Sequence, residues 1–164
     1  MKKINIVLLL MITGTLLAQS HSSYVDLGLP SGTQWKIINE GELLTYDEAI
    51  NRYGDKMPTR EQFEELLDYC EEEWTGKGMK LTGPNGKFII LQATGNYDCS
   101  GKYQNKYNMD YWSRTQYKDG TAYAIFYWYR DKEVTNGYCT ISKGISGGRG
   151  NSHKCNKYAI RLVK

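Results

Sequence analysis

Two helix-start patterns lie close together in the first half of this 164-residue chain, and strand-like segments fill most of the rest. Thr45 with Glu48, and Thr59 with Gln62, each match a capping box, in which two side chains satisfy backbone N–H groups at a helix start. Gly54 is placed to end the first helix. The second helix has an apolar side made of Phe63, Leu66, Leu67 and Cys70 and an acidic side made of Glu64, Glu65, Asp68 and Glu71.

Short strands are predicted on both sides of these helices. The predicted strands are Tyr24–Leu27, Trp35–Ile38, Met79–Leu81, Phe88–Leu91, Tyr111–Thr115, Thr121–Arg130, Val134–Ile141 and Tyr158–Val163. Asn85-Gly86 supplies the positive φ angles of a tight hairpin. Thr121–Arg130 is apolar on both faces, which is typical of a central strand, and 93–110 has the composition of an irregular loop. Helices followed by many short strands predict an α+β fold.

Residues 1–20 have the layout of a secretory signal peptide, with Lys2 and Lys3 before an apolar run and a small-residue cleavage site. We therefore predict a single exported domain over residues 21–164, with no membrane span after cleavage, located outside the cytoplasm as a secreted, surface or periplasmic protein. Loss of the two lysines reduces 21 basic residues to 19 against 18 acidic ones, a net charge of +1. Charge therefore gives no indication of a nucleic-acid partner.

Four cysteines lie in the predicted exported part: Cys70, Cys99, Cys139 and Cys155. An even number in an exported chain indicates two disulfides. Three connectivities are possible, and we expect neighbours to pair, Cys70 with Cys99 and Cys139 with Cys155. No C-x-x-C spacing supports a zinc site, and we expect no metal or other cofactor.

Five sequence landmarks follow one another in order along the chain. They are Tyr24-Val25-Asp26-Leu27-Gly28-Leu29-Pro30-Ser31-Gly32 ending at Trp35, Met57-Pro58-Thr59 leading into Glu65-Leu66, Gly83-Pro84-Asn85-Gly86, Tyr111-Trp112-Ser113-Arg114-Thr115, and Ile160-Arg161-Leu162-Val163. Together they resemble the Fibrobacter succinogenes major paralogous domain family, a group of exported bacterial domains related to the C-type-lectin-like fold. The resemblance covers nearly all of the chain after residue 20.

The resemblance implies a C-type-lectin-like fold with a binding role. It implies that the first strand, Tyr24–Leu27, pairs with the last, Tyr158–Val163, and that Tyr111 and Trp112 are structural. Sugar-binding members of this fold chelate calcium through Glu-Pro-Asn or Gln-Pro-Asp, and neither tripeptide occurs here. Pro84-Asn85 follows Gly83, so the carboxylate that calcium requires is missing.

The common catalytic arrangements lack their parts in this sequence. A catalytic triad would depend on His153, which lies in a loop beside Cys155. A pair of carboxylates from Asp98, Asp110 and Asp119 could serve a glycoside hydrolase, although acidic loop residues commonly serve turns. We expect no enzymatic activity.

Tyrosine is the residue in excess, with 14 copies beside 4 tryptophans. Rigid amphipathic rings are enriched at binding surfaces, and those in loops are least needed for the core. The predicted ligand-binding residues are Tyr97, Tyr103, Asn105, Tyr107, Arg149 and His153.

We therefore predict an exported, non-catalytic binding module for a glycan or a protein outside the cell. Two alternatives stay open: a structural or accessory subunit of a pilus-like surface assembly, and a hydrolase of glycan or cell-wall polymer.

Overall fold

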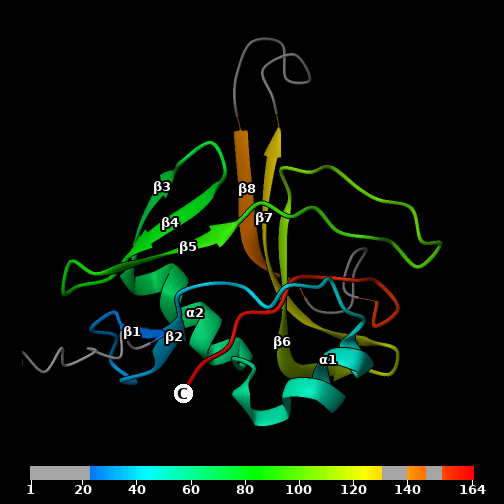
Figure 1. The fold of residues 1–164 in the computed structure, drawn as a ribbon, viewed down its shortest axis with the longest axis horizontal. Helices are drawn as coiled ribbons and strands as arrows, with labels where there is room; N and C mark the ends of the chain where they lie inside the picture. The colour runs from blue at the N-terminus through cyan, green and yellow to red at the C-terminus, as the bar shows by residue number, and fades with distance from the viewer. Residues whose placement is uncertain (1–22, 131–139, 147–152) are drawn as a thin grey trace, which may run out of the picture.

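The computed structural model describes residues 23–130, 140–146 and 153–164, which form an α+β fold (Figure 1). Its α-helices are α1 (Tyr46–Tyr53) and α2 (Arg60–Tyr69), and a short 3-10 helix, Gly54–Lys56, follows α1. Its strands are β1 (Tyr24–Asp26), β2 (Gln34–Lys36), β3 (Glu71–Trp74), β4 (Gly78–Thr82), β5 (Phe88–Gln92), β6 (Met109–Lys118), β7 (Thr121–Arg130) and β8 (Thr140–Ser146). They form three antiparallel sheets with the orders β1-β2, β3-β4-β5 and β6-β7-β8. The predicted α+β class is confirmed.

Some sequence predictions fall outside the described residues. The predicted signal peptide, residues 1–20, lies outside them entirely. Most of the predicted strand Val134–Ile141 does too, because the description resumes at Thr140, where β8 begins. No described helix has the length and apolar character needed to cross a bilayer.

Both predicted helix starts are confirmed. Thr45 caps α1 and Thr59 caps α2, and in each the reciprocal capping-box bonds to Glu48 or Gln62 are present. Gly54 caps the C-terminal end of α1. Because these bonds join residues only three positions apart, local sequence is sufficient to predict them.

The predicted extent of the second helix is wrong. It ends at Tyr69, Cys70 has an extended backbone with φ −98° and ψ 141°, and Glu71 begins β3. In β3 the backbone pairs with β4, with Glu72 opposite Leu81. Alternation then leaves Glu71 and Glu73 exposed, and charged side chains suit an edge strand because they discourage pairing with other chains.

The hairpin predicted around Asn85-Gly86 is confirmed. It joins β4 to β5, and the Gly86 N–H donates to the Gly83 carbonyl at 2.9 Å. Gly86 has φ +79°, a left-handed conformation that glycine adopts without steric cost.

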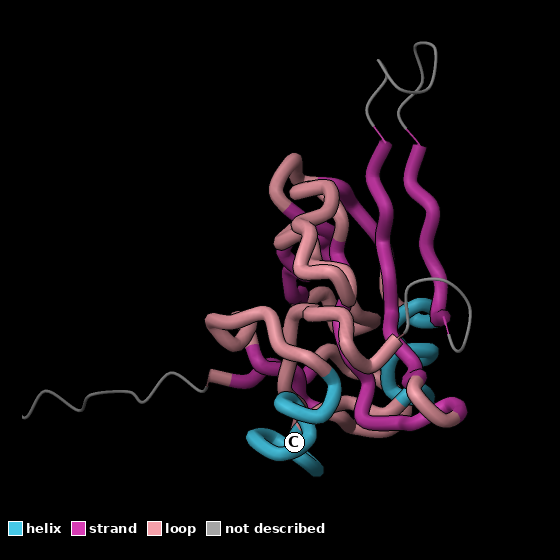
Figure 2. The backbone as a smooth tube through the Cα atoms, turned by 90° about the vertical axis from the view of Figure 1, so that its right-hand side faces the viewer, coloured by secondary structure: helices cyan, strands magenta, loops and turns pink. Residues whose placement is uncertain are grey.

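The β6-β7-β8 sheet separates two hydrophobic clusters. Tyr111 and its partner Ile125 belong to the cluster that contains residues of α2, β4 and β5. The next pair, Trp112 and Ala124, belongs to the cluster that contains residues of α1. As predicted, β7 is the central strand. Tyr111 and Trp112 are both buried, which is consistent with their predicted structural role. The ends of β7 and β8 project beyond the other described elements (Figures 1 and 2).

The predicted pairing of the first and last strands is wrong in its detail. β1 pairs with β2 through a short local hairpin, and the C-terminal segment adds to β2 instead, with Val163 opposite Trp35. The segment makes isolated bridges and no regular strand. The two ends of the domain are nevertheless close, because the Lys164 ammonium lies 5.0 Å from the centre of the Tyr24 ring.

A buried cation anchors this C-terminal segment. Arg161 has no exposed surface, and its guanidinium donates to the carbonyls of Lys36, at 2.7 Å, and Ile90. It thereby joins the segment to β2 and β5. Burial lowers the pKa of Arg161 below its ordinary value, yet arginine keeps its charge in proteins. Among the described carboxylates none forms an ion pair with it within 4.0 Å.

We expect Arg161→Met to lower the free energy of unfolding by about 2–4 kcal/mol. Methionine fills comparable space but leaves the Lys36 and Ile90 carbonyls without a buried donor. Urea denaturation at pH 7 measures the loss. Lys164→Met removes the same charge from an exposed position and should change stability by less than about 0.5 kcal/mol. Equal effects of the two substitutions would contradict the role of Arg161.

Candidate functional site

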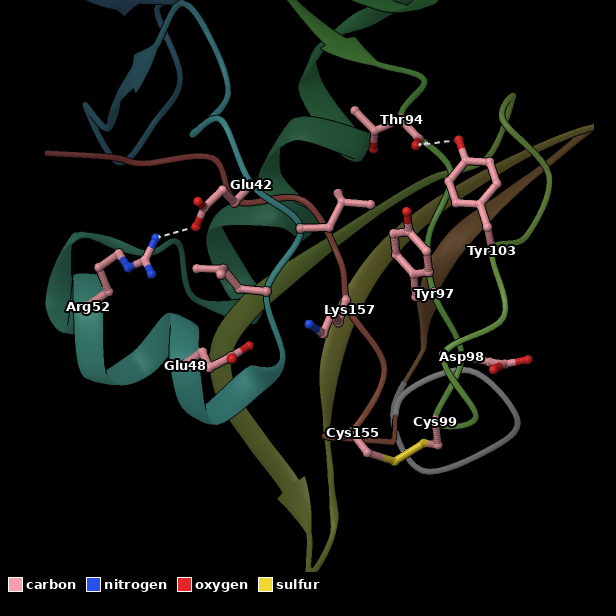
Figure 3. Close-up of a pocket in the computed structure, with 13 residues that line it drawn as sticks. Glu42, Glu48, Arg52, Thr94, Tyr97, Asp98, Cys99, Tyr103, Cys155 and Lys157 are labelled. Carbon is pink, nitrogen blue, oxygen red and sulfur yellow. Dashed lines mark hydrogen bonds and ion pairs between the residues drawn. A yellow bond between two sulfur atoms is a disulfide. The ribbon is translucent and has the colours of Figure 1, made fainter.

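An open groove of about 980 Å³ lies between α1 and the loop that follows β5 (Figure 3). One wall is α1 with the segment before it, and the other is the loop that carries Tyr97 and Tyr103. The Cys99–Cys155 disulfide and Lys157 lie between the two walls (Figure 3).

The aromatic wall is held by backbone hydrogen bonds. Tyr97 forms antiparallel bridges with both Tyr103 and Lys157. The rings of Tyr97 and Tyr103 lie 5.1 Å apart at 59° and are 37% and 46% exposed. The Tyr103 hydroxyl donates to the Thr94 carbonyl at 2.8 Å. Gly95, with φ +64°, permits this arrangement because a Cβ there would overlap the Tyr103 hydroxyl.

The disulfide in the groove joins Cys99 to Cys155, so the predicted pairing of neighbouring cysteines is wrong. The antiparallel bridge between Tyr97 and Lys157 explains the pairing. Cys99 lies two residues after Tyr97, and Cys155 lies two residues before Lys157. In an antiparallel pair these positions are opposite one another, and their Cα atoms are 5.0 Å apart.

The other two cysteines lie elsewhere. Cys70 has no disulfide partner among the described cysteines; it packs at the edge of the core, and burial raises its pKa to about 11. Cys139 lies outside the described residues.

The opposite wall of the groove carries charged side chains that are already bonded. Arg52 of α1 forms an ion pair with Glu42 at 2.8 Å. Glu48 accepts hydrogen bonds from the Thr45 backbone N–H at 2.9 Å and from its hydroxyl at 2.8 Å. These bonds lower the pKa of Glu48 below its ordinary value, and Lys157 adds a smaller electrostatic contribution.

A buried polar cluster lies behind the aromatic loop. Asp110 accepts hydrogen bonds from the side-chain amide of Asn96 at 2.5 Å and from the Trp128 indole N–H at 3.1 Å. Burial raises the pKa of Asp110 from 3.8 to about 6, although both hydrogen bonds act in the opposite direction. Since Asn96 directly precedes Tyr97, this cluster helps to set the position of the loop.

Two of the three carboxylates considered for hydrolysis, Asp98 and Asp110, accept hydrogen bonds within the domain. Asp98 accepts hydrogen bonds from the backbone N–H groups of Ser100 and Lys102 and from the side chains of Ser100 and Gln104. The Ser100 hydroxyl contributes most to lowering the pKa of Asp98. Asp110 is 1% exposed, whereas Asp119 lies exposed in the turn between β6 and β7.

The predicted ligand-binding residues do not all gather at the groove. Tyr97 and Tyr103 line it. Tyr107 is half-buried and lines a neighbouring pocket that shares Thr94 and Tyr103 with the groove. The Lys106 ammonium lies 5.0 Å from its ring centre, and Asn105 accepts a hydrogen bond from the Tyr107 N–H at 2.9 Å. Those two residues shape the loop.

The remaining two predicted ligand-binding residues are not part of the groove as described. His153 is exposed, forms a bridge with Thr121, and is not among the groove-lining residues. Arg149 lies outside the described residues.

Sequence reasoning missed the charged residues of the groove. Glu42, Glu48 and Arg52 come from α1 and the segment before it, whereas Lys157 comes from the distant C-terminal segment. Their types are common on any protein surface, so no local pattern marks them. Among the described residues no group of three or more His, Cys, Asp or Glu side chains is arranged to hold a metal ion.

No protein-family model matches this chain, and no curated protein or solved structure is significantly similar to it. The resemblance to the Fibrobacter succinogenes family and the C-type-lectin-like fold therefore stays a prediction.

We expect a non-reducing peptide map to recover Cys99 linked to Cys155, because the antiparallel backbone pairing places them opposite one another. Replacing both by serine should lower the free energy of unfolding by about 2–4 kcal/mol, since the unfolded chain loses its cross-link. Recovery of Cys70 linked to Cys99 would contradict the structure.

Asp110 should make the protein more stable as the pH falls from 7 to 4. The folded state holds this proton more tightly than the unfolded chain, because the pKa of Asp110 is about 6 when folded and near 3.8 when unfolded. Stability from this group is therefore complete below pH 4 and lost as the pH rises through 6. The shift corresponds to about 2–3 kcal/mol.

The measurement is chemical denaturation of wild type and Asp110→Asn across this pH range. Subtracting the free energy of unfolding of Asp110→Asn from that of wild type removes the contributions of the other titrating groups. This difference should increase as the pH falls. A difference that stays constant with pH would contradict the assignment.

Proposed function

We propose that the protein is an exported, non-catalytic binding module of C-type-lectin-like type that recognises a glycan in the groove between α1 and the aromatic loop. The observation that carries the proposal is the pair of exposed tyrosine rings, Tyr97 and Tyr103, held side by side along an open groove. Their positions depend on backbone bridges and a disulfide, so little ordering entropy is lost when a ligand binds.

The chemistry of the groove favours a glycan over a protein partner. Its described lining includes five charged residues: Glu42, Glu48, Arg52, Asp98 and Lys157. The centre of a protein–protein interface is depleted of charged residues. A sugar presents apolar ring faces edged by hydroxyl groups, and the groove offers aromatic faces edged by hydrogen-bonding side chains.

The arrangement of the domain supports the proposed fold and location. Two helices precede most of the strands, the two ends lie close together, and a long loop with Tyr97 and Tyr103 borders the groove. A disulfide within the domain fits an oxidising compartment outside the cytoplasm.

We expect Tyr97→Ala and Tyr103→Ala each to weaken glycan binding by about tenfold or more, because truncating an aromatic contact residue removes its apolar surface from the ligand. A glycan array identifies the ligand, and titration calorimetry measures the affinity. Tyr69→Ala is the matched control, since Tyr69 is 52% exposed at the end of α2 and is not among the groove-lining residues.

Two results would count against the proposed site. One is equal loss of binding in all three variants, and the other is full binding by the Tyr97 and Tyr103 variants. Retention of proteins but no glycans would favour a protein partner.

A further inference from the structure

Lys157 places an ammonium group in the middle of the groove, beside Tyr97 and facing the α1 wall (Figure 3). Its backbone N–H donates to the Tyr97 carbonyl at 2.9 Å, and its carbonyl accepts from the Tyr97 N–H at 3.1 Å. On one side Cys155 is held by its disulfide, and on the other Tyr158 exchanges backbone hydrogen bonds with Leu44 at 3.0 Å. The base of the lysine side chain is therefore fixed.

The other charges of the groove already have partners. Arg52 is paired with Glu42, and Glu48 is hydrogen-bonded to Thr45. Asp98 accepts bonds from its own loop. By contrast, no described residue accepts a hydrogen bond from the Lys157 ammonium, and no described carboxylate lies within 4.0 Å of it. Its three donors are open to a ligand.

Tyr97 and Lys157 are directly opposite one another in an antiparallel bridge. Side chains at such positions lie on the same face, with Cβ atoms about 4.5–5.5 Å apart. A sugar ring that rests on the Tyr97 face therefore brings its substituents within reach of the ammonium. A carboxylate on that ring would form a charge-assisted hydrogen bond, which is stronger than a bond to a neutral hydroxyl.

We infer that the groove binds an acidic glycan, in which the carboxylate of a uronic acid residue pairs with Lys157 while its ring lies against Tyr97. This inference rests on the proposed glycan-binding function. Of the described residues, three acidic and two basic ones line the groove: Glu42, Glu48 and Asp98 against Arg52 and Lys157. Among the described lining residues, Lys157 is the cation without a partner, which suits a single carboxylate; a dianionic phosphate carries twice the charge and would be repelled more strongly by the neighbouring carboxylates.

The test uses oligouronates of several sugar configurations, each paired with its carboxyl-reduced, neutral counterpart. Wild type should bind at least one oligouronate about tenfold more tightly than its reduced partner. Lys157→Met should remove that preference, and Lys157→Arg should keep most of it. Lys102→Met controls for net charge, because Lys102 is exposed in the same loop but does not line the groove. Thermal unfolding confirms that each variant is folded.

The outcomes separate this inference from the proposed function. Equal binding of acidic and neutral partners by wild type, or an unchanged preference in Lys157→Met, overturns the acidic ligand and leaves glycan binding intact. Tighter binding to sulfated analogues than to oligouronates also overturns the assignment of a carboxylate. Binding to no member of a broad glycan panel overturns both proposals.

Discussion

The packing of the C-terminal segment, residues 153–164, is the constraint on which the rest of the described structure depends. Val163 pairs with β2, Tyr158 with the segment before α1, and Ala159 with β6. Arg161 adds the contacts to β2 and β5 from within the core. Burying a guanidinium costs solvation free energy. Hydrogen bonds to the Lys36 and Ile90 carbonyls, which are far from Arg161 in sequence, offset part of that cost.

The same segment builds the candidate binding site. The bridge between Tyr97 and Lys157 sets the register that brings Cys99 to Cys155. Core and groove therefore share one stretch of backbone, because Cys155 and Lys157 line the groove while Arg161 and Val163 lie in the core. A ligand that binds the assembled groove would raise the stability of the whole domain by mass action.

The features that were predicted correctly depend on contacts between near neighbours in sequence. The capping boxes at Thr45 and Thr59 and the turn at Gly86 each involve residues within a few positions of one another. The family resemblance also predicts a structural role for Tyr111 and Trp112, and both side chains are buried. The helix end was misjudged because Cys70 and Glu71 continue the helical pattern, while pairing with β4, a tertiary contact, draws the chain into β3.

By itself the sequence determined the α+β class, both helix starts, the hairpin turn and the concentration of tyrosines in the second half of the chain. Only the tertiary structure decided that Cys99 pairs with Cys155, that the Tyr97 and Tyr103 rings lie 5.1 Å apart, and that Lys157 lies between them and α1. Hydrogen bonds within a turn depend on residues that are neighbours in sequence, so the local sequence is enough to predict them. The register between distant segments depends on how the whole core packs.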